Sequence, residues 1–246
     1  MASHHATCAG SQEPQGLSAV HAITSNIKPL DLTRYKTLVF DCDGVVLDSN
    51  ELKTQAYYTV ATAFGASHEQ AQALMDYHVR LGGVSRYPKF KYFQQEILHQ
   101  PVTETATQTL LAGFAAEIHK GLLNCQIAPG LHELRKATPQ ASWMLLSGGD
   151  QQELNALFAE RGIAELFDAG IFGSPDNKDT VLARELANAN LEQPAIYFGD
   201  SRYDHEASTN ASLDFVFVSG WTELEDWEAY CKQHGIIMIE QLKDLL

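Results

Sequence analysis

Short apolar runs that alternate with helix-like stretches are the feature of this sequence that most limits its fold. The runs expected to form strands are 36–40, 142–146, 169–172, 195–198, 214–218 and 236–239. The stretches expected to form helices are 151–161, 179–190, 203–211 and 221–232. Strands separated by helices of this length favour right-handed crossovers, with helices on both faces of a parallel sheet. The pattern therefore predicts an α/β fold with a three-layer, Rossmann-like core, whose ligands bind beyond the carboxyl ends of the strands.

Residues 51–123 break this alternation. Helical patterns at 51–64, 67–81, 87–99 and 103–123 are separated by Gly and Pro, and no strand is evident among them. A helical insertion after the first strand lies above the carboxyl end of that strand, where it can act as a lid. We therefore expect a mobile N-terminal segment over 1–30, an α/β core over 31–50 and 124–246, and a helical cap over 51–123.

The composition limits the partners of the protein. Its 31 acidic and 17 basic residues give a formal net charge of −14, which argues against nucleic acid as a partner. No segment has the apolar length of a membrane span. The cysteines are scattered, without the paired spacing of a zinc site, and fit a cytoplasmic protein. Because a negative field repels anionic substrates, a phosphate-handling protein of this charge needs cations near its site.

Two carboxylates stand at the end of the first expected strand. Asp41 and Asp43 are two residues apart on an extended segment, so their side chains project to the same side. Two carboxylates so close need a cation, and oxygen ligands of this kind suit Mg²⁺. Cys42 lies between them and is expected to be a buried structural thiol that faces the other way.

Polar residues also follow the later strands. Ser147 and Gly148 end the second run with a hydroxyl and free backbone N–H groups beside a helix start, which suits an anion. Lys178 opens the helix after the third run and offers a compact positive charge to a phosphate. Asp200 and Asp204 follow the fourth run at i and i+4 spacing, so they share a face of a helical turn.

Each of these motifs also has a purely structural explanation. The paired aspartates fit a surface turn, SGG fits a loop, Lys178 fits a solvated helix start, and Asp200 or Asp204 fits a helix cap. Their order along the chain, each just past the end of an expected strand, favours a catalytic site over a series of unrelated features.

In this order, the motifs resemble those of the haloacid dehalogenase superfamily. The likeness is to the subclass with a helical C1-type cap, which includes phosphoglycolate phosphatases and β-phosphoglucomutases, and it covers roughly residues 35–220. The residues that carry it are Asp41 and Asp43 in FDCDGVVLDS, Ser147 in LLSGG, Lys178, and Asp200 with Asp204 in FGDSRYD.

The resemblance implies a Mg²⁺-dependent phosphatase. Asp41 would attack the phosphorus to form an aspartyl-phosphate, and Asp43 would protonate the leaving oxygen and then activate water. Ser147, the N–H of Gly148 and Lys178 would bind the phosphate oxygens. The implied ligands of Mg²⁺ are Asp41, Asp43 through its backbone carbonyl, Asp200 and Asp204, the last being either a ligand or a partner of Lys178.

Other functions stay open. Dehalogenase members lack the second aspartate in this role, so Asp43 argues against dehalogenation. The related mutases have a histidine ten residues after that aspartate, where this chain has Lys53, and the difference favours a hydrolase over a mutase. A non-catalytic, phosphate-binding protein would be expected to have lost an aspartate or the lysine, and none of these residues is missing.

The expected cap supplies candidate cations for the substrate. The sequence GGVSRYPK at 82–89 links two cap helices, and this loop dips toward the active site in related enzymes. Arg86 is the first candidate for a substrate contact, followed by Lys89 and Lys53; alternatively, these side chains are solvated or paired with acids. A cationic lid favours a small phosphorylated metabolite, preferably a sugar phosphate or a phosphorylated acidic sugar, and excludes proteins as substrates.

Overall fold

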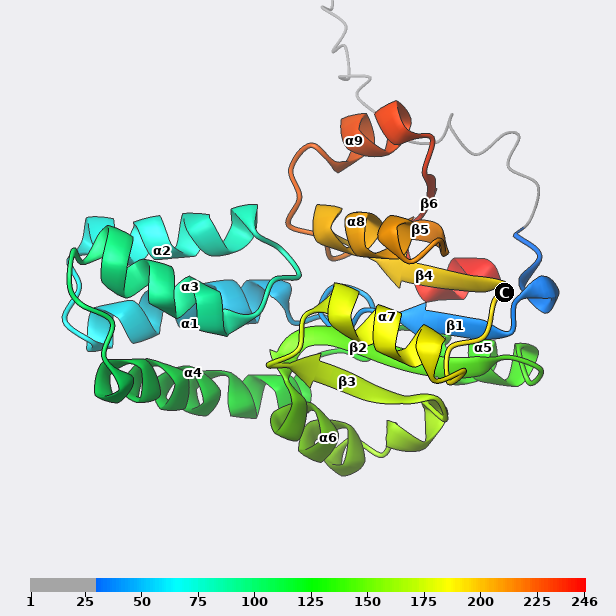
Figure 1. Ribbon diagram of the computed structural model, residues 1–246, viewed down its shortest axis with the longest axis horizontal. Helices are drawn as coiled ribbons and strands as arrows, with labels where there is room; N and C mark the ends of the chain where they lie inside the picture. Colours follow the sequence, from blue (N-terminus) through cyan, green and yellow to red (C-terminus); the bar gives the residue numbers. More distant parts are fainter. Residues whose placement is uncertain (1–29) are drawn as a thin grey trace, which may run out of the picture. The chain divides into compact units, whose positions relative to one another are not determined.

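A computed structural model describes residues 30–246, in which six strands form a single sheet (Figure 1). The strands are β1 (Thr37–Phe40), β2 (Ser142–Asp150), β3 (Gly170–Ser174), β4 (Ala195–Gly199), β5 (Asp214–Val218) and β6 (Ile237–Ile239). Their order is β3-β2-β1-β4-β5-β6, and each neighbouring pair is parallel. The predicted α/β fold is therefore confirmed. The segment expected over 1–30 lies outside the described residues, apart from Leu30.

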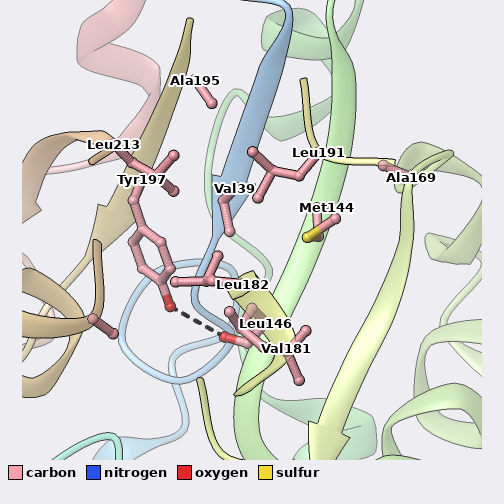
Figure 2. Packing of buried hydrophobic residues seen from close by; sticks show 11 residues of the cluster. Val39, Met144, Leu146, Ala169, Val181, Leu182, Leu191, Ala195, Tyr197 and Leu213 are labelled. Atoms are coloured by element: carbon pink, nitrogen blue, oxygen red, sulfur yellow. Dashed lines mark hydrogen bonds between the residues drawn. The ribbon is translucent and has the colours of Figure 1, made fainter. Parts of the chain in front are cut away.

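Helices cover both faces of the sheet. In the α/β part they are α5 (Leu131–Ala137), α6 (Gln151–Glu160), α7 (Lys178–Ala187), α8 (Arg202–Asn210) and α9 (Trp227–His234), with short 3₁₀ turns η1 (Leu32–Arg34), η3 (Ala164–Leu166) and η4 (Leu242–Leu245). On one face, Val39, Met144 and Tyr197 share a buried cluster with Val181 of α7 and Ala207 of α8 (Figure 2). The helices α7 and α8 therefore cover this face.

The opposite face of the sheet is aromatic. The rings of Phe40 and Phe198 stack with their centroids 5.1 Å apart, and the Phe40 ring lies 4.5 Å from that of Trp143. Phe167 joins this group and lies 5.5 Å, between ring centroids, from Phe158 of α6. Because both faces of the central strands are covered, most residues of these strands are apolar, as in buried parallel strands generally.

Four helices form an insertion between β1 and β2. They are α1 (Asn50–Ala63), α2 (His68–Arg80), α3 (Arg86–Tyr92), which continues into a π-helical turn η2 (Phe93–Ile97), and α4 (Glu104–Asn124). The buried rings of Tyr57, Phe90 and Phe114 contact one another and so join α1, α3 and α4. In Figure 1 these helices gather beyond the carboxyl ends of β1, β2 and β4.

The chain leaves the α/β part and returns to it at one place. Leu47 and Ile127 form an isolated antiparallel bridge. Next to it, the N–H of Asp48 donates to the carbonyl of Gln126 at 2.9 Å. The two connecting segments therefore run side by side between the sheet and the insertion.

One expected element begins later than predicted, and another element is new. The helix expected from Trp221 begins at Trp227 instead. The reason lies in the preceding loop, where Thr222 Oγ1 donates to the carbonyl of Asp200 at 2.7 Å and the Glu223 carboxylate accepts a hydrogen bond from α1. The short helix α5 follows a Pro-Gly pair that reads as a turn, and it has no counterpart among the expected elements. None of the described helices combines the length and the apolar character needed to cross a membrane.

Candidate active site

The carboxyl ends of β1, β2 and β4 open into a cavity of about 260 Å³. Its floor comes from the last residues of these strands and from the segments that follow them, and includes Asp41, Gly148 and Asp200. Its opposite wall comes from the insertion and from the loop after β5, and includes Lys89 and Glu223. The cavity therefore lies where parallel α/β sheets bind ligands, with part of its wall supplied by the insertion.

Lys178 joins two of the carboxylates predicted from the sequence. It is the first residue of α7, and the side chain of Asn177 caps this helix. Its Nζ donates to Oδ1 of Asp41 at 2.8 Å and to Oδ1 of Asp204, and all three side chains are buried. Burial disfavours the charged amine, but the two carboxylates outweigh this effect and raise the pKa of Lys178 well above its usual value. The amine is therefore charged at neutral pH.

Asp204 is surrounded by protein donors. Its Oδ1 accepts from Lys178 and from the hydroxyl of Tyr197 at 2.9 Å. Its Oδ2 accepts from the backbone N–H and the Oγ of Ser201, at 3.1 and 2.6 Å. With four donors around it, Asp204 fits the role of a partner of Lys178 better than that of a direct metal ligand.

Asp43 is held by two donors from the start of α1. Ser49 Oγ donates to its Oδ1, and Lys53 Nζ donates to its Oδ2 at 2.6 Å. Burial raises the pKa of Asp43, but Lys53 and the two hydrogen bonds outweigh burial, so this pKa lies below its usual value. Asp43 is therefore a carboxylate at neutral pH in this arrangement. The neighbouring Cys42 is buried and does not line the main cavity.

Three buried carboxylates, those of Asp41, Asp200 and Asp204, each place an oxygen within 4.8 Å of the others. Burial and neighbouring negative charges raise the pKa of Asp41 to about 7 and that of Asp200 well above its usual value. Asp41 Oδ2 and Asp200 Oδ1 accept no hydrogen bond from residues 30–246. Because every fully buried side-chain nitrogen or oxygen in this range has a partner, these two oxygens face the cavity. Crowded carboxylates with free oxygens fit a divalent cation such as Mg²⁺.

The second motif predicted from the sequence lies near the end of β2. Ser147 is buried, and its Oγ accepts from the N–H of Gly149 at 3.0 Å. Gly148 lines the cavity. A Cβ atom on Gly148 would lie 2.5 Å from the carbonyl oxygen of Gly83, so the close approach of the insertion to β2 requires glycine here.

The three cations proposed from the cap sequence have different partners, and all three line the cavity. Arg86 is buried and makes a bidentate ion pair with Glu153 of α6, with N–O distances of 3.0 and 2.7 Å. Lys53 has its own carboxylate partner, as described above. Lys89 is buried, and its Nζ lies 2.8 Å from Nδ1 of His78. Arg86 therefore pairs with a carboxylate of the α/β part of the chain, whereas Lys89 contacts the imidazole ring of His78 and no carboxylate within residues 30–246.

Several residues of the site were not anticipated from the sequence. Asn50 Nδ2 donates to Oδ2 of Asp200 at 2.7 Å and to the carbonyl of Trp221 at 2.8 Å. Tyr57 and His78 line the cavity from the insertion. Asn50 carried a usable signal, because it follows the first motif at the start of a helix. Tyr57 and His78 look like ordinary residues of amphipathic helices, and no pattern sets them apart.

The chain resembles known proteins in both its sequence and its fold. The parallel sheet and the strand-end carboxylates define a protein of the α/β class with an inserted helical segment. The family model of the haloacid dehalogenase-like hydrolases matches residues 35–211, so the chain belongs to that family, as its motifs predicted. No curated protein matches the chain.

Solved structures with the same fold include phosphatases and a mutase by their descriptions. A predicted phosphatase from Clostridium acetobutylicum is 18% identical, with a TM-score of 0.66, and the match covers 86% of this chain and 96% of that one. A predicted phosphoglycolate phosphatase from Haemophilus somnus is 15% identical, with a TM-score of 0.63 and coverages of 87% and 97%. A proposed β-phosphoglucomutase from Thermotoga maritima is 18% identical, with a TM-score of 0.59 and coverages of 86% and 96%. At these identities the likeness shows the fold alone.

Proposed function

We propose that this protein is a Mg²⁺-dependent phosphatase that acts on a small phosphorylated metabolite through an aspartyl-phosphate on Asp41. The observation that carries the proposal is the environment of Asp41, whose Oδ1 accepts from Lys178 while its Oδ2 faces the cavity. A carboxylate held in this way can attack a phosphorus atom placed above it. Membership of the haloacid dehalogenase-like hydrolase family agrees with this chemistry.

In the proposed reaction Asp41 is the nucleophile, and Asp43 is the acid in the first half-reaction and the base in the second. One carboxylate oxygen of Asp41 forms a bond to phosphorus while the bond from phosphorus to the leaving oxygen breaks, and Asp43 gives the leaving oxygen its proton. Asp43 then takes a proton from a water molecule, which attacks the aspartyl-phosphate and releases inorganic phosphate. Because Lys53 holds Asp43 as a carboxylate, this ion pair suits the second half-reaction and must open for the first.

The transferred phosphate needs donors for its other oxygens. Lys178 uses two of its three ammonium protons on Asp41 and Asp204, which leaves one for a phosphate oxygen. We assign the same role to the backbone N–H of Gly148 and to Ser147, at the end of β2. Donors at these positions would stabilise the charge that spreads over the phosphate oxygens during transfer.

The residues that would hold Mg²⁺ are Asp41, the backbone carbonyl of Asp43, and Asp200. Asn50 orients Asp200 through its hydrogen bond to Oδ2, and Asp204 supports the site by holding Lys178. When bound, Mg²⁺ supplies positive charge that offsets the negative charge of the phosphate and of the carboxylates.

We assign the role of a lid to the cap, residues 51–123. Two contacts join α3 to the start of α6: the Arg86–Glu153 ion pair and a hydrogen bond of 2.8 Å from the hydroxyl of Tyr87 to Asp150. A lid held in this way excludes water from the cavity. The small volume of the cavity favours a metabolite such as a sugar phosphate over a protein substrate.

The test is phosphate release from an aryl phosphate by the purified protein, with MgCl₂ or with EDTA. We expect release with Mg²⁺, none with EDTA, and none from Asp41→Asn. Asp76→Asn, an exposed residue of α2, is the matched control and should retain activity. Product analysis with a hexose phosphate separates hydrolysis from transfer of phosphate within the sugar, which a mutase would catalyse. No release by the wild-type protein from aryl or sugar phosphates contradicts the proposal.

A further inference from the structure

Lys89 is a buried cation whose charge has no partner in the part of the chain that the structure describes. The other buried cations that line the cavity, Lys53 and Arg86, form ion pairs with Asp43 and Glu153, whereas Lys89 forms none. A buried charge without an opposite charge is costly. In its protonated form, Lys89 in the wall of the cavity therefore calls for an anion that the described part of the chain does not supply.

The carboxylates that face Lys89 are already engaged. Asp43 accepts from Lys53 and Ser49. Glu223 faces Lys89 from the loop after β5, but its Oε2 accepts from Thr54 at 2.8 Å, and no ion pair joins it to Lys89. Neither carboxylate therefore neutralises Lys89 in this arrangement.

Two further donors stand beside Lys89. An ammonium group has no acceptor, so His78 Nδ1, at 2.8 Å, must accept from it, and the ring proton of His78 then lies on Nε2. The Tyr57 ring stacks on the His78 ring with centroids 4.3 Å apart. These residues come from α1, α2 and α3, so three helices hold this group in place.

The hydroxyl of Tyr57 is free. Tyr57 is 2% exposed as a residue, and its hydroxyl makes no hydrogen bond within residues 30–246. Because each fully buried polar side-chain atom in this range has a partner, the Tyr57 hydroxyl must contact open space, and Tyr57 lines the main cavity. A buried phenol that presents an unused donor to a cavity points to a ligand there.

We propose that the substrate carries a carboxylate in addition to its phosphate, and that Lys89, His78 and Tyr57 bind this carboxylate. The inference rests on the proposed phosphatase function and narrows its substrate class to phosphate esters of small hydroxy acids, acidic sugars included. A carboxylate has one negative charge and matches the one uncompensated ammonium group, whereas a second phosphate would bring a further charge with no cation left to meet it. A neutral sugar would leave Lys89 unpaired.

The test compares two substrates that differ only in charge. Phosphate release is measured with excess Mg²⁺ from the phosphate ester of a hydroxy acid and from the ester of its carboxamide, together with an aryl phosphate. We expect kcat/KM of the wild-type protein to be about tenfold or more higher for the acid than for the amide, as for a charge-assisted hydrogen bond. In Lys89→Met this ratio should fall to about one, whereas Lys91→Met, an exposed lysine of the same helix, should retain it.

Each outcome decides the proposal. A wild-type protein that hydrolyses the aryl phosphate but gives equal or lower kcat/KM for the acid overturns the carboxylate site and leaves the phosphatase function standing. A preference that survives in Lys89→Met also overturns it. If Lys89→Met does not fold, Tyr57→Phe, which removes one hydroxyl, should lower the ratio several-fold, and an unchanged ratio in that variant rejects the site. No release from any ester removes the phosphatase function and this inference together.

Discussion

Lys53 Nζ lies 2.6 Å from Oδ2 of Asp43, so a lysine of the insertion holds the proposed acid–base residue as a carboxylate. The two residues are ten positions apart and stand at the first turn of α1 and in the turn after β1. The protonation state of Asp43 therefore depends on the position of the first turn of α1, which carries Lys53. An opening movement of the insertion would separate the pair and allow Asp43 to take up a proton.

Replacement of this lysine should change the pH dependence of the reaction. In Lys53→Met, burial acts on Asp43 without the opposing cation, so the pKa of Asp43 should rise. Because the attack of water on the aspartyl-phosphate needs Asp43 as a carboxylate, we expect kcat to fall by about 10- to 100-fold at pH 6, and to fall less as the pH rises. Rates of aryl phosphate hydrolysis between pH 5 and 9 measure this, with Lys36→Met on the surface as the control. An unchanged pH profile would show that Lys53 does not act on Asp43.

Asp204 should be essential for stability as well as for activity. Asp204→Asn removes the negative charge that forms an ion pair with Lys178. It also places an amide group where four hydrogen-bond donors converge. Since breaking a buried ion pair is strongly destabilising, we expect a loss of about 3–5 kcal/mol in the free energy of unfolding. Urea denaturation measures it. Asp226→Asn, in an exposed ion pair, should change stability by less than about 0.5 kcal/mol, and a loss of similar size in both variants contradicts the prediction.

Removal of the unpaired lysine should stabilise the protein. Burial lowers the pKa of Lys89 to about 7 in the folded chain, so the folded protein binds Lys89's proton more weakly than the unfolded chain does. The cost is complete below pH 7 and shrinks as the pH rises toward 10. Lys89→Met should therefore gain about 2–5 kcal/mol at pH 6, and the gain should decrease by about 1.4 kcal/mol per pH unit above 7.

Urea denaturation of this variant at pH 6 and 9 checks the prediction. Lys91→Met should show neither the gain nor its pH dependence, because that side chain is exposed. A gain of equal size at both pH values would mean that packing, rather than charge, causes it.

The metal-free protein should lose stability as the pH rises. The raised pKa values of Asp41 and Asp200 mean that the folded chain binds these protons more tightly than the unfolded chain, so stability falls from about pH 4 through pH 7 and beyond. Mg²⁺ should restore it at pH 8, by about 2.7 kcal/mol at a concentration 100-fold above Kd, and much less at pH 5.

Thermal unfolding with EDTA or MgCl₂ at these two pH values measures the effect. Asp200→Asn should raise the melting temperature of the metal-free protein at pH 8 and abolish the response to Mg²⁺, whereas Asp76→Asn should retain the response. An equal Mg²⁺ response in wild type and Asp200→Asn rejects this group of carboxylates as the binding site.

The strands and the residues at their ends could be located from the sequence because burial on both faces of a parallel sheet leaves short but uninterrupted apolar runs. It could not predict the partners of the cap residues. Arg86 meets Glu153 across 67 positions of sequence, and only the docking of α3 on α6 brings them together. The late start of α9 was missed for a similar reason, since Thr222 is held by a backbone carbonyl of the site rather than by helical periodicity.

The bridge between Leu47 and Ile127 holds both ends of the insertion together at one point beside the sheet. Because the closed loop begins and ends at this bridge, β1 and β2 can keep their register whatever chain runs between them. Doubling the length of a flexible loop costs only about 0.6 kcal/mol in closure free energy. The segment that selects the substrate can therefore be exchanged or rebuilt in evolution while Asp41 and Lys178 stay in place, and new specificity can arise without a new reaction centre.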